Sequence, residues 1–153
     1  MYPRRALFFA LDAIIRVVVG DDGYRWEFDP RLPGLLRDYT ALGYRLFGLL
    51  DCADFGLALE TEQERCDLVE YINQLLQEAD APSLDAIHIT NDVTDPRFVW
   101  NLRRRYDFSL STSIVVATDD RYKALQFNAG LGHVESAEHV LGEVCQPSLA
   151  MAD

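Results

Sequence analysis

Lysine is nearly absent from this sequence of 153 residues, in which Lys123 is the one example. Lysine and arginine together number 14 against 25 aspartates and glutamates, so the formal net charge is −11 at pH 7. Contacts to phosphate groups depend on clusters of Lys and Arg, and this balance therefore argues against nucleic acid and anionic membranes as partners. A basic protein or a cation is the better electrostatic match.

Long apolar runs and paired cysteines are also missing. No apolar run approaches the roughly 20 residues of a membrane span, so the sequence predicts a soluble protein. Cys52, Cys66 and Cys145 are odd in number and widely spaced, which argues against a disulfide framework or a zinc knuckle and favours a reducing cytoplasm. Two arginines precede the first apolar run as in a signal peptide, but Asp12 interrupts the run and no small-residue cleavage site follows.

Several common catalytic motifs are absent as well. The sequence has no Gly-rich phosphate loop, no G-x-S-x-G elbow and no C-x-x-C pair. His133 and His139 have no partner at metal-ligand spacing, and His88 lies inside a short apolar run. The sequence therefore gives no support to the enzyme classes that are built on these motifs.

The composition is that of a globular protein. Hydrophobic residues make up 49% and charged residues 25% of the chain, and a chain of this length buries roughly two-thirds of its extended surface. We expect a single domain over residues 1–153, with a C-terminal tail from about residue 136 that is partly ordered.

The stretch from Arg5 to Val17, RALFFALDAIIRV, is the one around which the chain is organised. Its residues 6–10 are apolar enough for a strand that is buried on both faces, and Asp12 falls where such a strand ends. Ligands of open α/β sheets bind outside the carboxyl ends of the strands. We therefore expect the side chains of residues 10 and 12, which point the same way, to face a crevice at that end.

Strands and helices are expected to alternate along the rest of the chain. Such alternation predicts an α/β fold, with a doubly wound parallel sheet in which residues 6–11 lie between residues 44–50 and 113–118. Thr61 and Glu64 form a capping-box pair before the longest helix. The other expected strands are 86–90 and a short one near 133–134, the hairpin is 14–19 with 24–28, and the helices are 32–42, 61–79, 96–106 and one capped by Asp120 that stops at 129–131.

The first strand resembles a known motif. An apolar strand that opens a chain and ends in D-x-D-G-T is the first motif of the haloacid dehalogenase-like phosphohydrolases, and LFFALDAI resembles it with Ala10 in place of the first Asp. Asp12 matches the second Asp, whereas Ala13 and Ile14 replace Gly and Thr. The resemblance implies a three-layer sheet with a hairpin flap after the first strand. It also makes residue 10 the nucleophile position and Asp12 the general acid/base and a metal ligand.

The other functional positions of this family are altered too. The resemblance places Leu50 where a phosphate-binding Ser or Thr belongs, and no lysine precedes the fourth strand. Arg97 or Arg103 is a possible substitute, although the run 103–105 is more typical of a solvated helix face. The family's acidic metal ligands, G-D-x-x-x-D, correspond to residues 117–122, ATDDRY, so both acids are displaced. The remaining candidates are Asp51, Thr118 and Arg97 for ligand binding, and Asp12, Asp119 and Asp120 for a metal.

Five aspartates fall at or just after predicted strand ends, and we expect them to make that face acidic without compensating cations, so that it repels phosphate esters. The first hypothesis is a domain that has lost phosphatase activity and serves as a binding or scaffolding protein without a cofactor. The second is a phosphohydrolase that uses Mg²⁺ at an atypical site. The third is a small acidic inhibitor or immunity-type protein that binds a basic partner, although the sequence contains no partner motif. The five residues are Asp12, Asp51, Asp92, Asp119 and Asp120.

Overall fold

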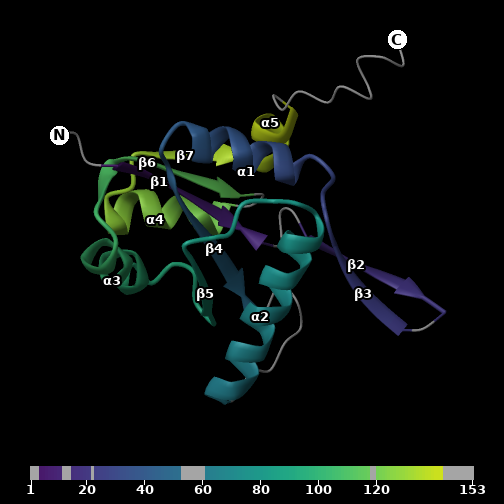
Figure 1. Ribbon diagram of the computed structural model, residues 1–153. Coiled ribbons are helices and arrows are strands. Elements are labelled where there is room, and N and C mark those ends of the chain that lie inside the picture. The colour runs from purple at the N-terminus through teal and green to yellow at the C-terminus, as the bar shows by residue number, and fades with distance from the viewer. Residues whose placement is uncertain (1–3, 12–14, 22, 53–60, 118–119, 143–153) are drawn as a thin grey trace, which may run out of the picture.

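A five-stranded parallel sheet, in the order β5-β4-β1-β6-β7, organises the chain (Figure 1). The computed structural model describes residues 4–11, 15–21, 23–52, 61–117 and 120–142. The strands are β1 (Arg4–Ala10), β4 (Arg45–Asp51), β5 (Ala86–Thr90), β6 (Phe108–Ala117) and β7 (His133–Ser136). The helices are α1 (Leu32–Ala41), α2 (Glu62–Glu78), α3 (Arg97–Arg105), α4 (Lys123–Ala129) and α5 (Ala137–Gly142), with a 3₁₀ turn η3 (Asp120–Tyr122) before α4.

Strand β1 is central, as the sequence predicts. It pairs in parallel with β4, where Ala10 lies opposite Leu49, and with β6, where Phe9 lies opposite Val116. Residues 6–11 have no exposed surface. A strand with helices over both faces excludes water on both sides, which is why this run is apolar at every position rather than at alternate ones.

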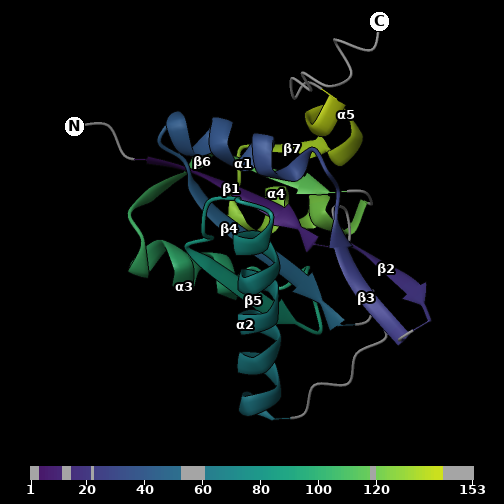
Figure 2. The same cartoon turned by 45° about the vertical axis from the view of Figure 1, so that its right-hand side comes forward.

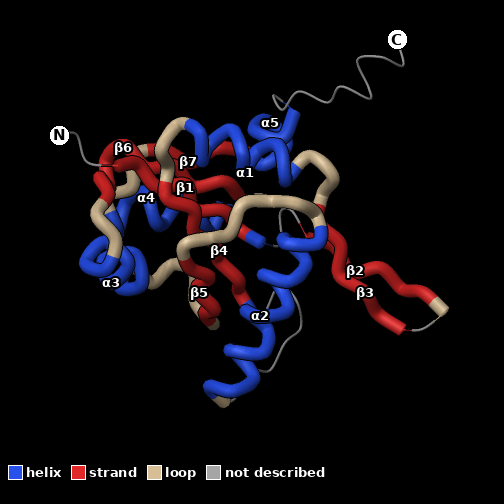
Figure 3. The backbone as a smooth tube through the Cα atoms, viewed as in Figure 1, coloured by secondary structure: helices blue, strands red, loops and turns tan. Residues whose placement is uncertain are grey.

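Two apolar clusters fill the two sides of the sheet, because successive side chains of a strand point to opposite faces. Leu7 and Phe9 pack with residues of α1, α2 and α5, whereas Phe8 and Ala10 pack with residues of α3 and α4. In the tube view the helices lie on either side of the strands (Figure 3). The predicted three-layer, doubly wound architecture is confirmed.

The predicted hairpin follows β1 and forms a second, two-stranded sheet. β2 (Ile15–Gly20) pairs antiparallel with β3 (Gly23–Phe28) up to the pair Gly20 and Gly23, so the turn is shorter than the four residues expected. The hairpin projects beyond the main sheet in both ribbon views (Figures 1 and 2). Its base is anchored, because Ile15, Trp26 and Phe28 pack against the cluster on the α1 and α2 side.

Helices α1 and α2 begin and end near the predicted residues, but one hydrogen bond of the predicted capping box is different. Thr61 caps α2 by accepting a hydrogen bond from the main-chain N–H of Glu64 (3.1 Å). In a capping box the Glu64 carboxylate would accept the main-chain N–H of Thr61. Here it accepts a hydrogen bond from the Thr61 hydroxyl instead (3.0 Å). Gly43 and Gly130, which the sequence places after α1 and α4, have φ of +88° and +80°, a conformation that favours glycine and stops a helix.

The tripeptide Asp-Pro-Arg precedes two of the helices. Asp29 accepts the main-chain N–H of Arg31 before α1 (2.9 Å), and Asp95 accepts that of Arg97 before α3 (3.0 Å). In both cases the arginine guanidinium also donates to the same carboxylate. The carboxylate thus satisfies a main-chain donor at a helix start and is held by its neighbour's charge.

A register shift in β6 is the main irregularity of the sheet. Arg5 pairs with Ser109, but Leu7 pairs with Ile114. The fully buried Ser113 bridges the shift, since its hydroxyl accepts the N–H of Ala6 (2.9 Å) and donates to the carbonyl of Ser109 (2.5 Å). The expected strand over residues 113–118 therefore begins five residues earlier, at Phe108.

One prediction at the C-terminal side is wrong. Asp120 does not cap a helix with its side chain but begins the turn η3, and α4 starts at Lys123 without a side-chain cap. Residues 137–142 form α5, which was not predicted from the sequence and which buries Ala137, Val140 and Leu141 against the core; residues 143–153 of the expected tail lie outside the described residues. No helix within the described ranges is long and apolar enough to span a membrane.

Candidate active-site region at the carboxyl ends of the strands

The end of β1 is closed by apolar packing. Ala10 has no exposed surface and lies in the same cluster as Val93 and Tyr122, which follow β5 and β6 respectively. We expected residue 10 to face a crevice, but this position is buried. Asp12, the neighbouring candidate, lies outside the described residues.

An ion pair joins the two strands on either side of β1. The Arg121 Nη1 atom donates to the Asp51 Oδ2 atom at 2.9 Å. Asp51 ends β4 and its side chain is only 4% exposed, whereas Arg121 belongs to η3, just after β6, and is 38% exposed. Because β1 lies between β4 and β6, the pair bridges the carboxyl end of the central strand.

This ion pair corrects the expectation of an acidic face without cations. Asp51 was expected to act as a ligand-binding group, but its charge is largely buried and directly paired with Arg121. The pairing was missed because the two residues lie 70 positions apart. The available signal was the position of Arg121 immediately after two aspartates at a predicted strand end.

The side chains next to Asp51 are not reactive groups. Leu50 is fully buried in the cluster on the α1 and α2 side, so it contributes packing where the resemblance would place a phosphate-binding hydroxyl. The Cys52 thiol is 4% exposed, and burial, followed by the nearby Asp51 charge, raises its pKa. A thiol with a raised pKa stays protonated at neutral pH and is a poor nucleophile.

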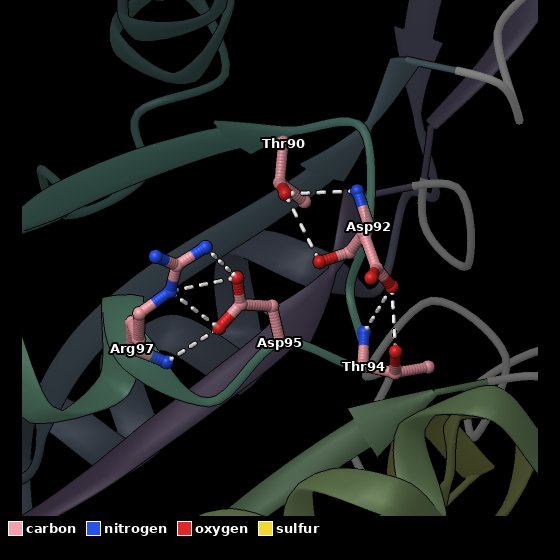
Figure 4. A network of polar contacts seen from close by, with 5 residues as sticks. All are labelled: Thr90, Asp92, Thr94, Asp95 and Arg97. Carbon is pink, nitrogen blue, oxygen red and sulfur yellow. Dashed lines mark hydrogen bonds and ion pairs between the residues drawn. The ribbon is translucent and has the colours of Figure 1, made fainter.

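Polar contacts after β5 form a self-contained network (Figure 4). The Asp92 carboxylate accepts from the main-chain N–H of Thr94 (3.0 Å) and from its hydroxyl (2.6 Å), and Thr90 Oγ1 accepts the N–H of Asp92 (3.0 Å). These short-range bonds fix the loop between β5 and α3. Asp92 is therefore engaged with its own loop, although it lies at a strand end as predicted.

Arg97 also has a local partner. Its Nε and Nη2 atoms donate to the Asp95 carboxylate at 2.9 and 2.6 Å (Figure 4). These hydrogen bonds, first from the guanidinium and then from the main chain of Arg97, lower the pKa of the Asp95 carboxyl to about 2. The Arg97 side chain is 80% exposed at the start of α3. In this arrangement Arg97 contacts Asp95 at the start of α3.

The candidate metal ligands are not brought together in the described part of the chain. Asp120 is 89% exposed and forms an ion pair with Lys123 (3.0 Å). Asp12, Thr118 and Asp119 lie outside the described residues. Among the residues that are described, no group of three or more His, Cys, Asp or Glu side chains is placed to hold a metal ion.

The comparisons with known proteins agree with this fold. No protein-family model matches the chain, and no curated protein matches it either. A structure from Mesorhizobium loti named as a HAD-like phosphatase is similar, with 12% identity and a TM-score of 0.66 over 89% of this chain and 72% of that one. D,D-heptose 1,7-bisphosphate phosphatase from Burkholderia thailandensis is similar with 16% identity and a TM-score of 0.57 over 85% and 75% of the two chains. The chain therefore has the haloacid dehalogenase-like fold.

Proposed function

We propose that this protein is a non-catalytic haloacid dehalogenase-like domain that acts by binding another molecule. The observation that carries the proposal is the residue at the nucleophile position, Ala10, whose methyl group is buried among apolar side chains. Covalent phosphoryl transfer requires an atom with a lone pair at that position, and a methyl group has none.

The surrounding charges support the same conclusion. Asp51 and Arg121 bind each other, and Arg97 binds Asp95, so these groups already have charged partners within the protein. A substrate phosphate would have to compete with a buried carboxylate for Arg121. Separating such a pair leaves an uncompensated buried charge, which is costly.

The second candidate function is a phosphohydrolase dependent on Mg²⁺. The observation in its favour is that the two similar structures described above carry the name of a phosphatase. Such an enzyme would hold Mg²⁺ with oxygen ligands, which suit this hard cation. The described side chains do not fit that role, because Ala10 has no side-chain oxygen and Asp120 is paired with Lys123. This candidate would therefore depend on Asp12 and Asp119.

The discriminating experiment is hydrolysis of p-nitrophenyl phosphate, with and without Mg²⁺, by the wild type and by Asp12→Asn. The non-catalytic proposal expects equal rates for the two proteins, because removing a general acid/base costs nothing where no reaction occurs. Asp92→Asn is the matched control, since it makes the same chemical change in a loop after β5. Mg²⁺-dependent turnover that Asp12→Asn abolishes and Asp92→Asn preserves would establish the phosphohydrolase instead.

A further inference from the structure

A groove of about 470 Å³ runs between α2 and the edge of the sheet. Helix α2 contributes Glu62, Arg65, Val69 and Glu70 to it, and β5 contributes Ile87 and Ile89, among others. In Figure 2, α2 lies directly in front of β5. Neither Asp51 nor Arg121 is among the residues that line the groove, and none of the described candidate site residues lines it.

The β5 side of this groove is a strand edge. Within the described ranges β5 pairs with β4 on one side and has no strand on the other. An edge strand presents a row of main-chain N–H and C=O groups, which is a template for another extended segment. All five residues of β5 are partly exposed, in contrast to residues 6–10 of β1, which are buried.

The groove also provides places for side chains. Ile87 and Ile89, two residues apart, point to the same face and form an apolar floor with Val69. The Nε atom of Arg65 is buried and has no hydrogen-bond partner in the described part of the chain. A main-chain carbonyl of an added strand is the kind of acceptor that would satisfy it.

The acidic side chains of α2 favour a partner segment of positive charge. The helix carries five carboxylates, Glu62, Glu64, Asp67, Glu70 and Glu78, against the single cation Arg65, and two of these acids line the groove. Alternate side chains of an added strand would point to the face that α2 and the isoleucines share, so Lys or Arg at those positions would place cations along that acidic wall, and the other side chains would point to the opposite face. Such complementarity favours binding and speeds encounter.

A second copy of the chain fits less well than such a segment. Antiparallel pairing of two β5 strands about a two-fold axis would bring the same face of both sheets to one side, and hence α2 beside its acidic equivalent. Each copy also carries a net charge of −11. Like charges placed side by side oppose that association.

We propose that the groove between α2 and β5 binds an extended, basic segment of a partner protein as an added strand of the sheet. The inference rests on the proposed binding function and names the site and the chemistry of the partner. Turnover of phosphate esters is measured independently, so failure of strand binding and failure of the non-catalytic assignment are distinguishable.

The test uses three fluorescent seven-residue probes with the purified protein at low salt. These are Lys-Val-Lys-Val-Lys-Val-Lys, the same peptide with Glu for Lys, and the lysine peptide N-methylated at every valine. We expect the unmodified lysine peptide to bind at least about tenfold more tightly than either of the others, which corresponds to roughly 1.4 kcal/mol. Amide hydrogen exchange of residues 86–90 should slow in its presence.

Matched charge variants locate the site. Glu62→Lys with Glu70→Lys should weaken binding of the lysine peptide by about tenfold or more, whereas Asp67→Lys with Glu78→Lys makes the same net change outside the groove and should leave it within about twofold. Equal effects of the two double variants, or equal binding of the N-methylated probe, would overturn strand addition. Light scattering that shows a dimer which only the groove variant dissociates would assign the groove to a second copy. Absence of binding by the lysine peptide would overturn the proposal as well.

Discussion

Asp51 and Arg121 form a 2.9 Å ion pair that links the end of β4 to the turn after β6. In a sheet ordered β4-β1-β6, these two segments flank the carboxyl end of the central strand. The two charges therefore stabilise the region where ligands of open α/β sheets usually bind, instead of being available to such a ligand.

Arg121→Ala should destabilise the protein. Breaking a fully buried ion pair commonly costs 3–5 kcal/mol, but Arg121 is 38% exposed, so we expect a loss of about 1–3 kcal/mol in the free energy of unfolding. Urea denaturation measures it. Arg103→Ala, an exposed arginine on α3, is the control and should change stability by less than about 0.5 kcal/mol. A loss for Arg121→Ala as small as that of the control would show that the pair has no structural role.

Ala10→Asp should not create a phosphatase and should weaken the fold. The new carboxyl would lie in a fully buried position among Val93, Tyr122 and other apolar side chains, and we expect a loss of about 2–4 kcal/mol. Thermal melting with and without Mg²⁺ and a phosphatase assay check both parts. The triple variant Ala10→Asp, Leu50→Thr, Thr118→Asp provides the comparison, because groups that catalyse together are non-additive. A single variant that is as stable as wild type and turns over would contradict the non-catalytic proposal.

Ser113→Ala should lower the free energy of unfolding, although it removes only one oxygen atom. The hydroxyl satisfies the buried N–H of Ala6 and the carbonyl of Ser109 at the register shift, and its loss leaves two main-chain groups without this partner. We expect a loss of about 1–3 kcal/mol in chemical denaturation. Ser111→Ala, an exposed residue of the same strand, is the matched control and should be neutral within about 0.5 kcal/mol. If the two alanine variants are equally stable, the bulge does not depend on the hydroxyl.

The Asp95–Arg97 pair predicts a specific pH dependence. The pKa of Asp95 is lowered to about 2 from its ordinary value of 3.8, so its contribution to stability is fully present above about pH 4 and is lost as the pH falls towards 2. In Arg97→Gln the pKa of Asp95 should rise towards its ordinary value, as measured by NMR titration of the carboxyl carbon. Arg104→Gln, a change of the same kind at the other end of α3, should leave that pKa in place.

The fold could be predicted from local patterns of apolar residues, because these patterns indicate which side chains are buried. The unbroken apolar run at residues 6–11 predicted a covered central strand, and AIHIT predicted β5 with its observed bounds. Helix α5 was missed, although Ala137, Val140 and Leu141 recur at helical spacing, because a six-residue helix carries too little pattern to be distinguished from a tail.

The candidate site was less predictable because its contacts join distant parts of the chain. A sequence shows that Asp51 and Arg121 lie near strand ends, but only the order of the strands shows that they meet. Conversely, the sequence predicts Arg97 as a ligand-binding residue and Asp92 as part of the acidic face, whereas their partners in the structure lie two positions away along the chain. The local Asp-Pro-Arg and Asp-Val-Thr motifs are the sequence signals of these contacts.

The pairing of β1 with β6 also governs how this chain reaches its native state. Ala6 is hydrogen-bonded to a residue 107 positions later, so the central strand is made before the other strands of its sheet and receives its second neighbour only after Ala117 has left the ribosome. Parallel sheets with such distant pairings fold slowly and expose aggregation-prone surface meanwhile. A chain truncated before β6 should therefore be a substrate for chaperones rather than a smaller stable domain.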